Sequence, residues 1–219
     1  MKEKRQALFI ICHPKPDSFC HALAQTARET AKQLGWESRY LDLYQEDFSP
    51  VLSLEELQRK TSFDPLIGDY EKLLLWCTDL LFFYPDWWGG PPALLKGWLD
   101  RVFRPGIAYD YRGLDEGPKV PIGLLTDKRA WVYVTRDSRS EETAPKGLRG
   151  KLISQEKQNA ILPNLDTSHH RIWIDSIQGF TGLNILGMRV FGPMYQSRIT
   201  QRREWLKQCR QDIGGSPGK

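Results

Sequence analysis

The chain contains 219 residues, of which 40% are hydrophobic and 26% are charged, and its formal net charge is +4 at pH 7. This composition is ordinary for one globular domain with a sizeable core, and the modest positive charge suits anionic ligands such as phosphates without indicating nucleic-acid binding. No run of about 20 apolar residues is present, and the first apolar run is too short for a signal peptide, so we expect a cytoplasmic protein without membrane insertion.

The cysteines support a reducing compartment. They show no CxxC spacing and are too few for a disulfide framework, and we expect no metal site. Cys12 and Cys77 stand among apolar residues, which predicts buried thiols.

The beginning of the chain predicts two strands joined by a helix. A continuous apolar run over residues 7–12 is typical of a strand in the middle of a parallel sheet. Ser18 is a suitable N-cap for a helix over residues 19–34, and Gly35 would end it. Residues 37–43 alternate in polarity, which predicts a half-exposed second strand.

The rest of the chain continues this alternation of strands and helices. Ser53 and Glu56 form a capping-box pattern at the start of a short helix. Glycine and proline punctuate residues 106–127, which we interpret as loop, and residues 136–157 are polar and expected to be mobile. The other expected elements are helices over 64–78, 92–103, 168–178 and 199–211 and strands over 80–84, 130–135 and 186–191.

Strands that alternate with helices predict an α/β fold with a parallel sheet and helices on both faces. Five strands fit the flavodoxin-like order 2-1-3-4-5, a three-layer sandwich that binds its ligand where the strand order switches. We expect one such domain over residues 1–213, followed by a disordered tail over residues 214–219.

Residues 80–111 contain the most distinctive pattern. An apolar strand breaks at Pro85 into a loop that carries Trp87 and Trp88, and a helix with one apolar stripe follows. Two indoles at the carboxyl end of a strand suit a planar ring. The alternative is that they fill a gap between helix and sheet, which composition alone favours.

This stretch resembles the flavin-dependent NAD(P)H:quinone oxidoreductases of the flavodoxin-like fold. The matching residues are Tyr84-Pro85, Trp87-Trp88, Pro92-Ala93, Leu95-Lys96-Gly97-Trp98, Asp100, Arg101-Val102-Phe103 and Ala108-Tyr109. The similarity covers most of the chain except residues 112–166. It implies FAD or FMN as the cofactor, NAD(P)H as electron donor, a homodimer, and two-electron transfer as hydride through flavin N5 to a quinone or similar planar acceptor.

The resemblance implies two cofactor-binding loops. In the first, the residues that would hold the flavin phosphates at a helix N-terminus are His13, Ser18 and Phe19. In the second, the residues that would carry the isoalloxazine ring are Pro85, Asp86, Trp87, Trp88 and Gly89. We expect Asp86 to point outward, because a carboxylate beside the ring would disfavour the anionic reduced flavin. Alternatively, Ser18 is an ordinary N-cap and His13 a strand-end histidine.

The segment after the fourth expected strand departs from the family. Thr135 and Arg136 stand where the family has a Thr-Thr-Gly turn at the pyrimidine edge of the flavin, and the usual Tyr-x-x-x-His pattern is missing. Arg136 is either near that edge or a solvated loop residue. The last helix carries three arginines that form a solvated face or meet a nucleotide phosphate: Arg198, Arg202 and Arg203.

The resemblance also implies catalytic residues. Tyr109 and Tyr111 would reach across the dimer interface into the partner's substrate pocket, or pack on their own subunit. His170, with His169 beside it, falls near the family's proton-relay histidine, although a helix cap is an equal alternative.

Two other functions fit the same resemblance. One is a regulatory flavodoxin-like subunit of a potassium-efflux transporter with weak or no turnover. The other is an electron carrier without NAD(P)H specificity, which the basic charge balance disfavours. The sequence leaves open FMN against FAD and NADH against NADPH.

Overall fold

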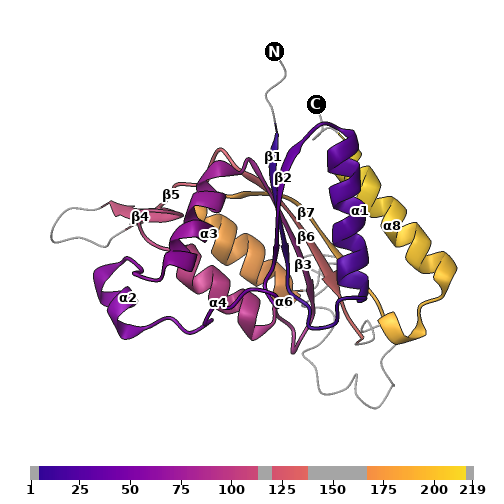
Figure 1. Cartoon of the computed structure of the whole chain (residues 1–219), viewed down its shortest axis with the longest axis horizontal. Coiled ribbons are helices and arrows are strands. Elements are labelled where there is room, and N and C mark those ends of the chain that lie inside the picture. The colour runs from indigo at the N-terminus through magenta and orange to yellow at the C-terminus, as the bar shows by residue number, and fades with distance from the viewer. Residues whose placement is uncertain (1–4, 113–119, 138–166, 216–219) are drawn as a thin grey trace, which may run out of the picture.

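The protein is described by a computed structural model that covers residues 5–112, 120–137 and 167–215. Five parallel strands form one sheet in the order β2-β1-β3-β6-β7 (Figure 1). They are β1 (Gln6–Ile11), β2 (Glu37–Asp42), β3 (Asp79–Pro85), β6 (Arg129–Thr135) and β7 (Asn184–Phe191). Counted along the chain, this is the predicted order 2-1-3-4-5.

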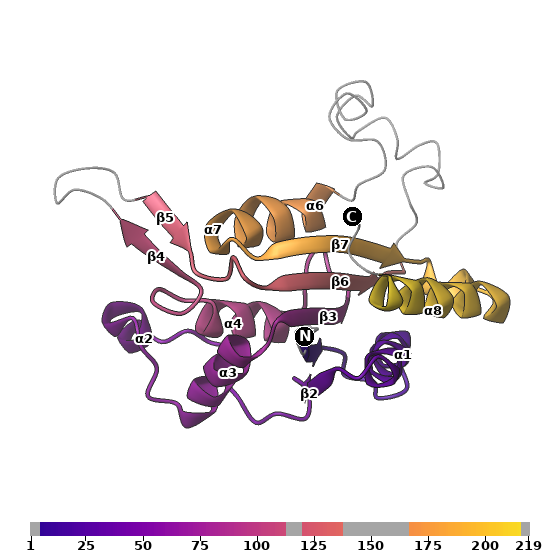
Figure 2. The ribbon, with the colours of Figure 1, turned by 90° about the horizontal axis from the view of Figure 1, so that it is seen from above.

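Helices cover both faces of the sheet. Figure 2 shows α1 (Phe19–Gln33) and α8 (Ile199–Gly214) side by side on one face. The opposite face carries α3 (Pro65–Trp76), α4 (Ala93–Val102) and a continuous helical stretch made of α6 (Thr167–His170), the π-helical η2 (Arg171–Gln178) and α7 (Gly179–Thr181). The short α2 (Leu54–Arg59) lies at the periphery (Figure 1), and the 3-10 turn η3 (Met194–Gln196) follows β7. The three predicted layers are therefore present.

The alternation of side chains along the central strands creates two apolar layers. Leu8 and Ile10 of β1 pack with α3 and α4, whereas Phe9 and Ile11 point to α1 and α8. Every residue of β3 is buried, as expected for a strand in the middle of a parallel sheet with both faces covered.

Local signals in the sequence account for several helix ends. The Ser18 side chain caps α1, and Ser53 and Glu56 form the expected capping box of α2. Cys12 and Cys77 are buried thiols, as predicted. The last helix continues to Gly214, beyond the expected end at residue 211.

The prediction that residues 106–127 are loop is wrong. Within them, β4 (Tyr109–Arg112) pairs in antiparallel fashion with β5 (Val120–Gly123) to form a hairpin beside the main sheet. Gly123 lets this hairpin approach α7, because a Cβ there would lie 2.3 Å from the carbonyl carbon of Thr181. The glycine that we interpreted as a loop signal therefore serves a close backbone contact.

Two other expectations concern segments only partly described. Of the stretch expected to be mobile, 138–157 lie outside the described residues, as do 216–219 of the expected tail. Among the helices that the structure describes, none combines the length and the apolar character needed to cross a bilayer.

Candidate functional site

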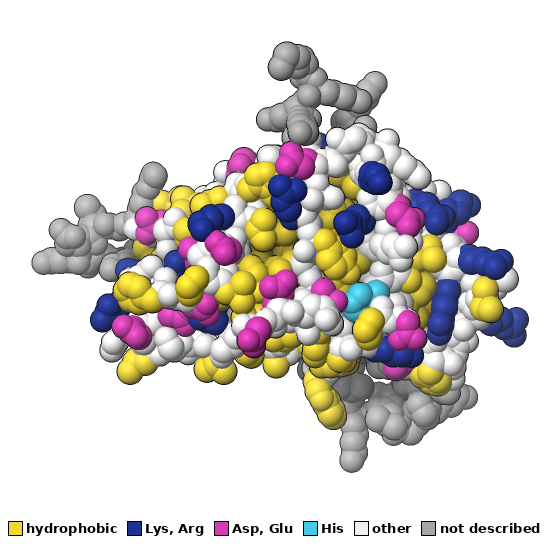
Figure 3. All heavy atoms as spheres, in the orientation of Figure 1, with side chains coloured by type: hydrophobic (Ala, Val, Ile, Leu, Met, Phe, Trp, Pro, Cys, Tyr) yellow, Lys and Arg dark blue, Asp and Glu magenta, His cyan; other side chains and the backbone are white. Residues whose placement is uncertain are grey.

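A hollow of about 640 Å³ lies at the carboxyl ends of β1, β3 and β6. It therefore occupies the point where the strand order switches, the usual ligand position in open α/β sheets. Its walls come from the loops after these three strands and from the segment that leads into α8. In Figure 3, histidine side chains reach the surface near the lower end of α1, where that helix begins. The residues lining the hollow are His13, Lys15, Asp17, Ser18, Phe19, Pro85, Asp86, Trp87, Trp88, Gly89, Thr135, Arg136, Asp137, Met194, Tyr195 and Arg202.

The loop between β1 and α1 presents hydrogen-bond donors to this hollow. Nδ1 of His13 accepts a hydrogen bond from the backbone N–H of Lys15 at 3.0 Å. Burial, with the nearby His21, lowers the pKa of His13 below its usual 6.5, so its imidazole is mainly neutral at pH 7. A neutral ring that accepts at Nδ1 carries its proton on Nε2, and His13 is therefore a donor to ligand oxygens.

The start of α1 adds an anion site to this loop. Ser18 caps the helix by accepting a hydrogen bond from the backbone N–H of His21 at 3.4 Å. The first amides of a helix have no intrahelical acceptor, and the helix dipole is positive at this end. The ring of Phe19 packs edge-on against Phe191 and Trp205 at 6.4 and 5.8 Å, so what Phe19 offers a phosphate is its backbone amide.

The tryptophan loop is a tight turn. The backbone N–H of Trp87 donates to Gly90 at 3.0 Å, and that of Gly90 donates back at 3.3 Å. Between them, Trp88 and Gly89 both have positive φ, 59° and 79°, the pattern of a type I′ turn. A left-handed conformation is strained for a tryptophan, and such strain concentrates at functional sites.

This turn exposes the indoles instead of burying them. Trp88 is fully exposed and Trp87 is 43% exposed. The alternative in which the two indoles fill a gap between helix and sheet is therefore wrong for Trp88. A free aromatic face next to the anion site suits a planar ligand that carries a phosphate.

The expectation that Asp86 points outward is wrong. Its side chain is 10% exposed, and Oδ1 lies 3.5 Å from Nε2 of His169, which is fully buried. The cause is the helix that begins at Thr167, which packs over the tryptophan loop: a Cβ on Gly89 would lie 3.4 Å from Oγ of Ser168. The carboxylate of Asp86 is thus held beneath the loop.

Thr135 and Arg136 line the hollow at the carboxyl end of β6. Thr135 is buried, its hydroxyl lies 3.1 Å from Sγ of Cys20, and its carbonyl accepts from the N–H of Asp86 at 2.7 Å. Arg136 is fixed through its backbone, whose N–H donates to Phe191 at 2.9 Å. The buried thiol of Cys20, on the first turn of α1, thus pairs with the end of β6.

Three of the sequence-predicted residues do not line the hollow of the single chain. Tyr109 and Tyr111 lie on β4, with their rings perpendicular at 5.6 Å, and Tyr109 also packs edge-on against Phe180 at 5.9 Å. His170 points elsewhere, with Nδ1 3.6 Å from Oδ1 of Asp175. Their expected roles stay predictions.

The structure adds wall residues that sequence patterns did not single out. Lys15 and Asp17 follow His13 directly, so their place in a loop after the first strand was a usable signal. Met194 and Tyr195 join the wall only because the chain returns from β7 to this edge of the sheet, which no local pattern indicates. Arg202, considered above for a phosphate contact, also lies here, although Ser197 and Met194 accept hydrogen bonds from its guanidinium at 2.7 and 2.9 Å.

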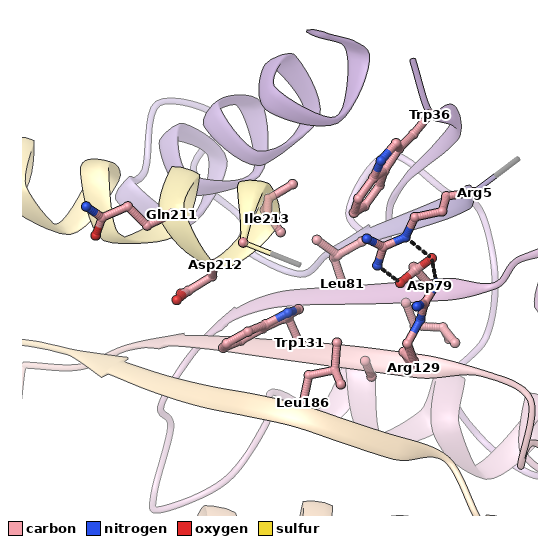
Figure 4. A pocket seen from close by; sticks show the side chains of 13 residues that line it. Arg5, Trp36, Asp79, Leu81, Arg129, Trp131, Leu186, Gln211, Asp212 and Ile213 are labelled. Atoms are coloured by element: carbon pink, nitrogen blue, oxygen red, sulfur yellow. Dashed lines mark hydrogen bonds and ion pairs between the residues drawn. The ribbon is translucent and has the colours of Figure 1, made fainter. Parts of the chain in front are cut away.

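A second hollow, of about 290 Å³, lies at the opposite edge of the sheet (Figure 4). Arg5 and Arg129 converge there on the carboxylate of Asp79, and Arg5 also stacks 3.7 Å above the ring of Trp36. Because its charged groups bind one another, this hollow offers a ligand less than the first. It also lies at the amino ends of the strands, away from the usual ligand edge.

Comparisons with known proteins agree with the fold. The sequence profile of the flavodoxin-like fold matches residues 5–211. The chain is similar to the NAD(P)H dehydrogenase [quinone] 1 of Cavia porcellus, with 29% identity over 69% of the chain and 60% of that protein. An uncharacterized NAD(P)H oxidoreductase of Haemophilus influenzae is 28% identical over 86% of the chain and 84% of its own length. The solved NAD(P)H:quinone oxidoreductase from Methanothermobacter marburgensis superposes with a TM-score of 0.72 at 24% identity, over 96% of each chain.

Proposed function

Because the chain belongs to the family of the flavodoxin-like fold, we propose that it is a flavin-dependent oxidoreductase that passes two electrons from NAD(P)H to a quinone or similar planar acceptor. The names of its relatives support the donor and the acceptor. The chain covers only 60% of the length of the Cavia porcellus relative, so this similarity alone does not establish the electron donor and acceptor of the chain.

The observation that carries the proposal is the combination of two features in one hollow. The start of α1, with its anion site, and the exposed indoles of Trp87 and Trp88 all line it. A volume of about 640 Å³ is within the range of cofactor pockets. FMN and FAD both combine a phosphate with a flat ring, and the residues present fit that combination.

We assign the cofactor contacts as follows. Nε2–H of His13, the hydroxyl of Ser18 and the backbone amide of Phe19 bind the phosphate. Residues 85–89 would orient the ring, and the indoles of Trp87 and Trp88 would exclude water from it. Thr135 and Arg136 contact its pyrimidine edge, where the positive charge of Arg136 favours negative charge on the ring.

A bound flavin would supply the redox chemistry, which is hydride transfer from NAD(P)H and two-electron reduction of the acceptor. The protein's own residues position the donor and the acceptor in turn against the same open face. We propose a homodimer in which Tyr109 and Tyr111 complete the partner's pocket and His170 handles a proton. The exposure of Tyr111, 40%, supports contact with a partner. Four buried free thiols support a cytoplasmic location.

The test is spectroscopic. The purified full-length protein should be yellow and should lose its colour when NAD(P)H is added without oxygen, and heating should release FMN or FAD identifiable by mass. Comparing NADH with NADPH identifies the donor. A colourless protein that takes up neither flavin contradicts the proposal. A yellow protein without turnover points to the regulatory or electron-carrier alternative.

A further inference from the structure

Behind the anion site, three side chains form a hydrogen-bonded chain. Oγ of Ser18 lies 2.9 Å from Nδ1 of His21, and Nε2 of His21 lies 3.0 Å from Oδ2 of Asp42. Ser18 lines the hollow, His21 is on the first turns of α1, and Asp42 is the last residue of β2. The side chains of His21 and Asp42 are each 13% exposed, so water does not replace these contacts.

The bonding partners fix where the protons are. Oδ1 of Asp42 accepts from the backbone N–H of Tyr44 at 3.2 Å, which leaves Oδ2 to accept from His21. Nε2 of His21 must therefore carry a proton. If His21 is neutral, its Nδ1 is an acceptor, and the only hydrogen of the Ser18 hydroxyl is donated to it. In that state Ser18 presents only a lone pair to the hollow, which an anion would avoid.

Protonation of His21 reverses this arrangement. An imidazolium donates from both nitrogens, so Nδ1–H donates to Oγ of Ser18 while Nε2–H still donates to Asp42. The Ser18 hydrogen is then free to turn into the hollow. A phosphate there favours the positive charge on His21, and the carboxylate of Asp42 stabilises it from the other side.

We infer that His21 is a positioning residue of the phosphate site: when a phosphate group binds, His21 takes up one proton from solvent and the Ser18 hydroxyl becomes a donor to the phosphate. This rests on the flavin site proposed above and deepens it, since it makes cofactor binding dependent on pH. Ser18 is thus more than a helix cap. His21 itself does not line the hollow, so its effect on the ligand passes through Ser18.

Among the titratable groups in this region, His21 is the one that we expect to take up a proton when a phosphate binds. His13, the nearest other imidazole, has its ring centroid 6.4 Å away. Its Nδ1 accepts a hydrogen bond from the backbone N–H of Lys15 at 3.0 Å, which a second ring proton would break, and burial also lowers its pKa. Burial raises the pKa of Cys12, at the end of β1, to about 12, and burial also raises that of Tyr40 on β2, so neither carries charge. The remaining groups, Lys15 and Asp17 on the loop, are exposed and lie 3.5 Å apart as an ion pair.

The experiment measures protons together with binding. Flavin-free full-length protein is titrated calorimetrically with FMN near pH 7.5 in two buffers of different ionisation enthalpy, and the difference gives the protons taken up. We expect up to one proton for the unchanged protein and clearly less for His21→Gln. Proton uptake also means that the FMN dissociation constant rises by up to about tenfold per pH unit between pH 7 and 8.5, a slope that His21→Gln should flatten.

Controls separate this effect from others. The FMN phosphate itself titrates with a pKa of about 6, which affects both proteins equally. Riboflavin, which has no phosphate, should bind without the difference between the two proteins. Asp42→Asn should reduce uptake because the cation loses its carboxylate. Gln25→Ala, an exposed position on the same helix, should behave like the unchanged protein.

The outcomes are distinguishable. If FMN binds and uptake is the same in both proteins, the inference about His21 is wrong and the flavin site stands. If neither FMN nor FAD binds, the proposed function fails. If His21→Gln does not fold, ¹⁵N NMR of the imidazoles in the unchanged protein decides, because His21 must pass from one protonated nitrogen to two when FMN binds.

Discussion

Oδ1 of Asp86 and Nε2 of His169 face each other at 3.5 Å, and among the described residues neither of these buried atoms has a hydrogen-bond partner. The pair lies directly beneath the tryptophan loop. It joins the end of β3 to the helix that begins at Thr167, and so connects the site to the second half of the chain.

The side chain of Trp173 determines the direction of the hydrogen bonds that lead to this pair. Nε1–H of Trp173 can only donate, and it donates to the hydroxyl oxygen of Tyr84 at 2.6 Å. The hydroxyl of Tyr84 lies 3.1 Å from Nδ1 of His169 and can donate to it. A neutral His169 that accepts at Nδ1 carries its proton on Nε2, aimed at Asp86. The two hydrogen bonds of Tyr84 thus orient the imidazole of His169, whose Nε2 faces the carboxylate at 3.5 Å.

This pairing predicts coupled stabilities. His169→Phe removes the hydrogen-bond partner of the Tyr84 hydroxyl and the imidazole that faces Oδ1 of Asp86, and we expect it to lower the free energy of unfolding by about 2–3 kcal/mol. Asp86→Leu together with His169→Phe should cost less than the sum of the single changes by about 1 kcal/mol or more. Urea denaturation of the unchanged protein, the two single variants and the double variant completes the double-mutant cycle. His170→Gln, at the more exposed neighbour, should change stability by less than about 0.5 kcal/mol, and additive single changes would contradict the pairing.

The turn at Trp88 predicts that a substitution there changes FMN affinity more than it changes folding stability. Trp88→Gly removes the strain of a positive φ, which offsets the extra flexibility that glycine gives the unfolded chain, so stability should change by less than about 1 kcal/mol. The loss of the exposed indole should weaken FMN binding about tenfold, which corresponds to about 1.4 kcal/mol. Fluorescence titration and thermal unfolding measure the two effects. Phe63→Ala, at another exposed aromatic, should leave FMN affinity unchanged.

The layers and strand order were predictable because their signals are local. The apolar run of β1, the cap at Ser18 and the aromatic loop after β3 each occupy a few consecutive residues, and right-handed crossovers leave few topologies. The hairpin was not predictable in the same way. Its second strand is four residues long and contains Pro121 and Gly123, both rare in strands, so its pairing depends on tertiary contacts.

The candidate site shows the same division. The places of His13 and Ser18 follow from a strand that leads into a capped helix. The inward position of Asp86 could not be predicted, because the buried partner that faces it, His169, is far along the chain and is brought there by the second half of the sheet. The bond between His21 and Asp42 likewise joins a helix to the end of a neighbouring strand.

Two helical glycines predict opposite results for the same substitution. A Cβ on Gly97 would lie 2.2 Å from the carbonyl oxygen of Pro50, so Gly97→Ala must displace backbone and should destabilise the protein by about 2 kcal/mol. Gly68, inside α3, has nothing within 4 Å of the same position, and Gly68→Ala should stabilise by about 0.5–1 kcal/mol. Thermal unfolding distinguishes them. Equal shifts for both variants would contradict the close approach of α4 to the segment before α2.

The buried guanidinium of Arg101 predicts a pH dependence of stability. It donates to Oε1 of Glu56 at 2.7 Å and to Oδ2 of Asp64 at 3.1 Å, and so joins α4 to α2 and to the cap of α3. Burial acts to raise the pKa of Glu56, but hydrogen bonds from Arg101, Ser62 and the backbone of Ser53 outweigh it and lower the pKa to about 2. The carboxylate is therefore held ionised well below its ordinary pKa of 4.5.

A folded-state pKa below the unfolded one means that the stabilisation is complete above the unfolded pKa and is lost as pH falls through the folded pKa. Stability should therefore decline between about pH 5 and pH 2, and Glu56→Gln should lower stability at pH 7 and flatten this decline. Urea denaturation of both proteins at several pH values measures this decline. Glu55→Gln, which removes an exposed carboxylate that pairs with Arg59 at 3.2 Å, should keep the unchanged slope, because surface pairs contribute little. A slope that is the same in Glu56→Gln and the unchanged protein would show that Arg101 does not hold this carboxylate ionised.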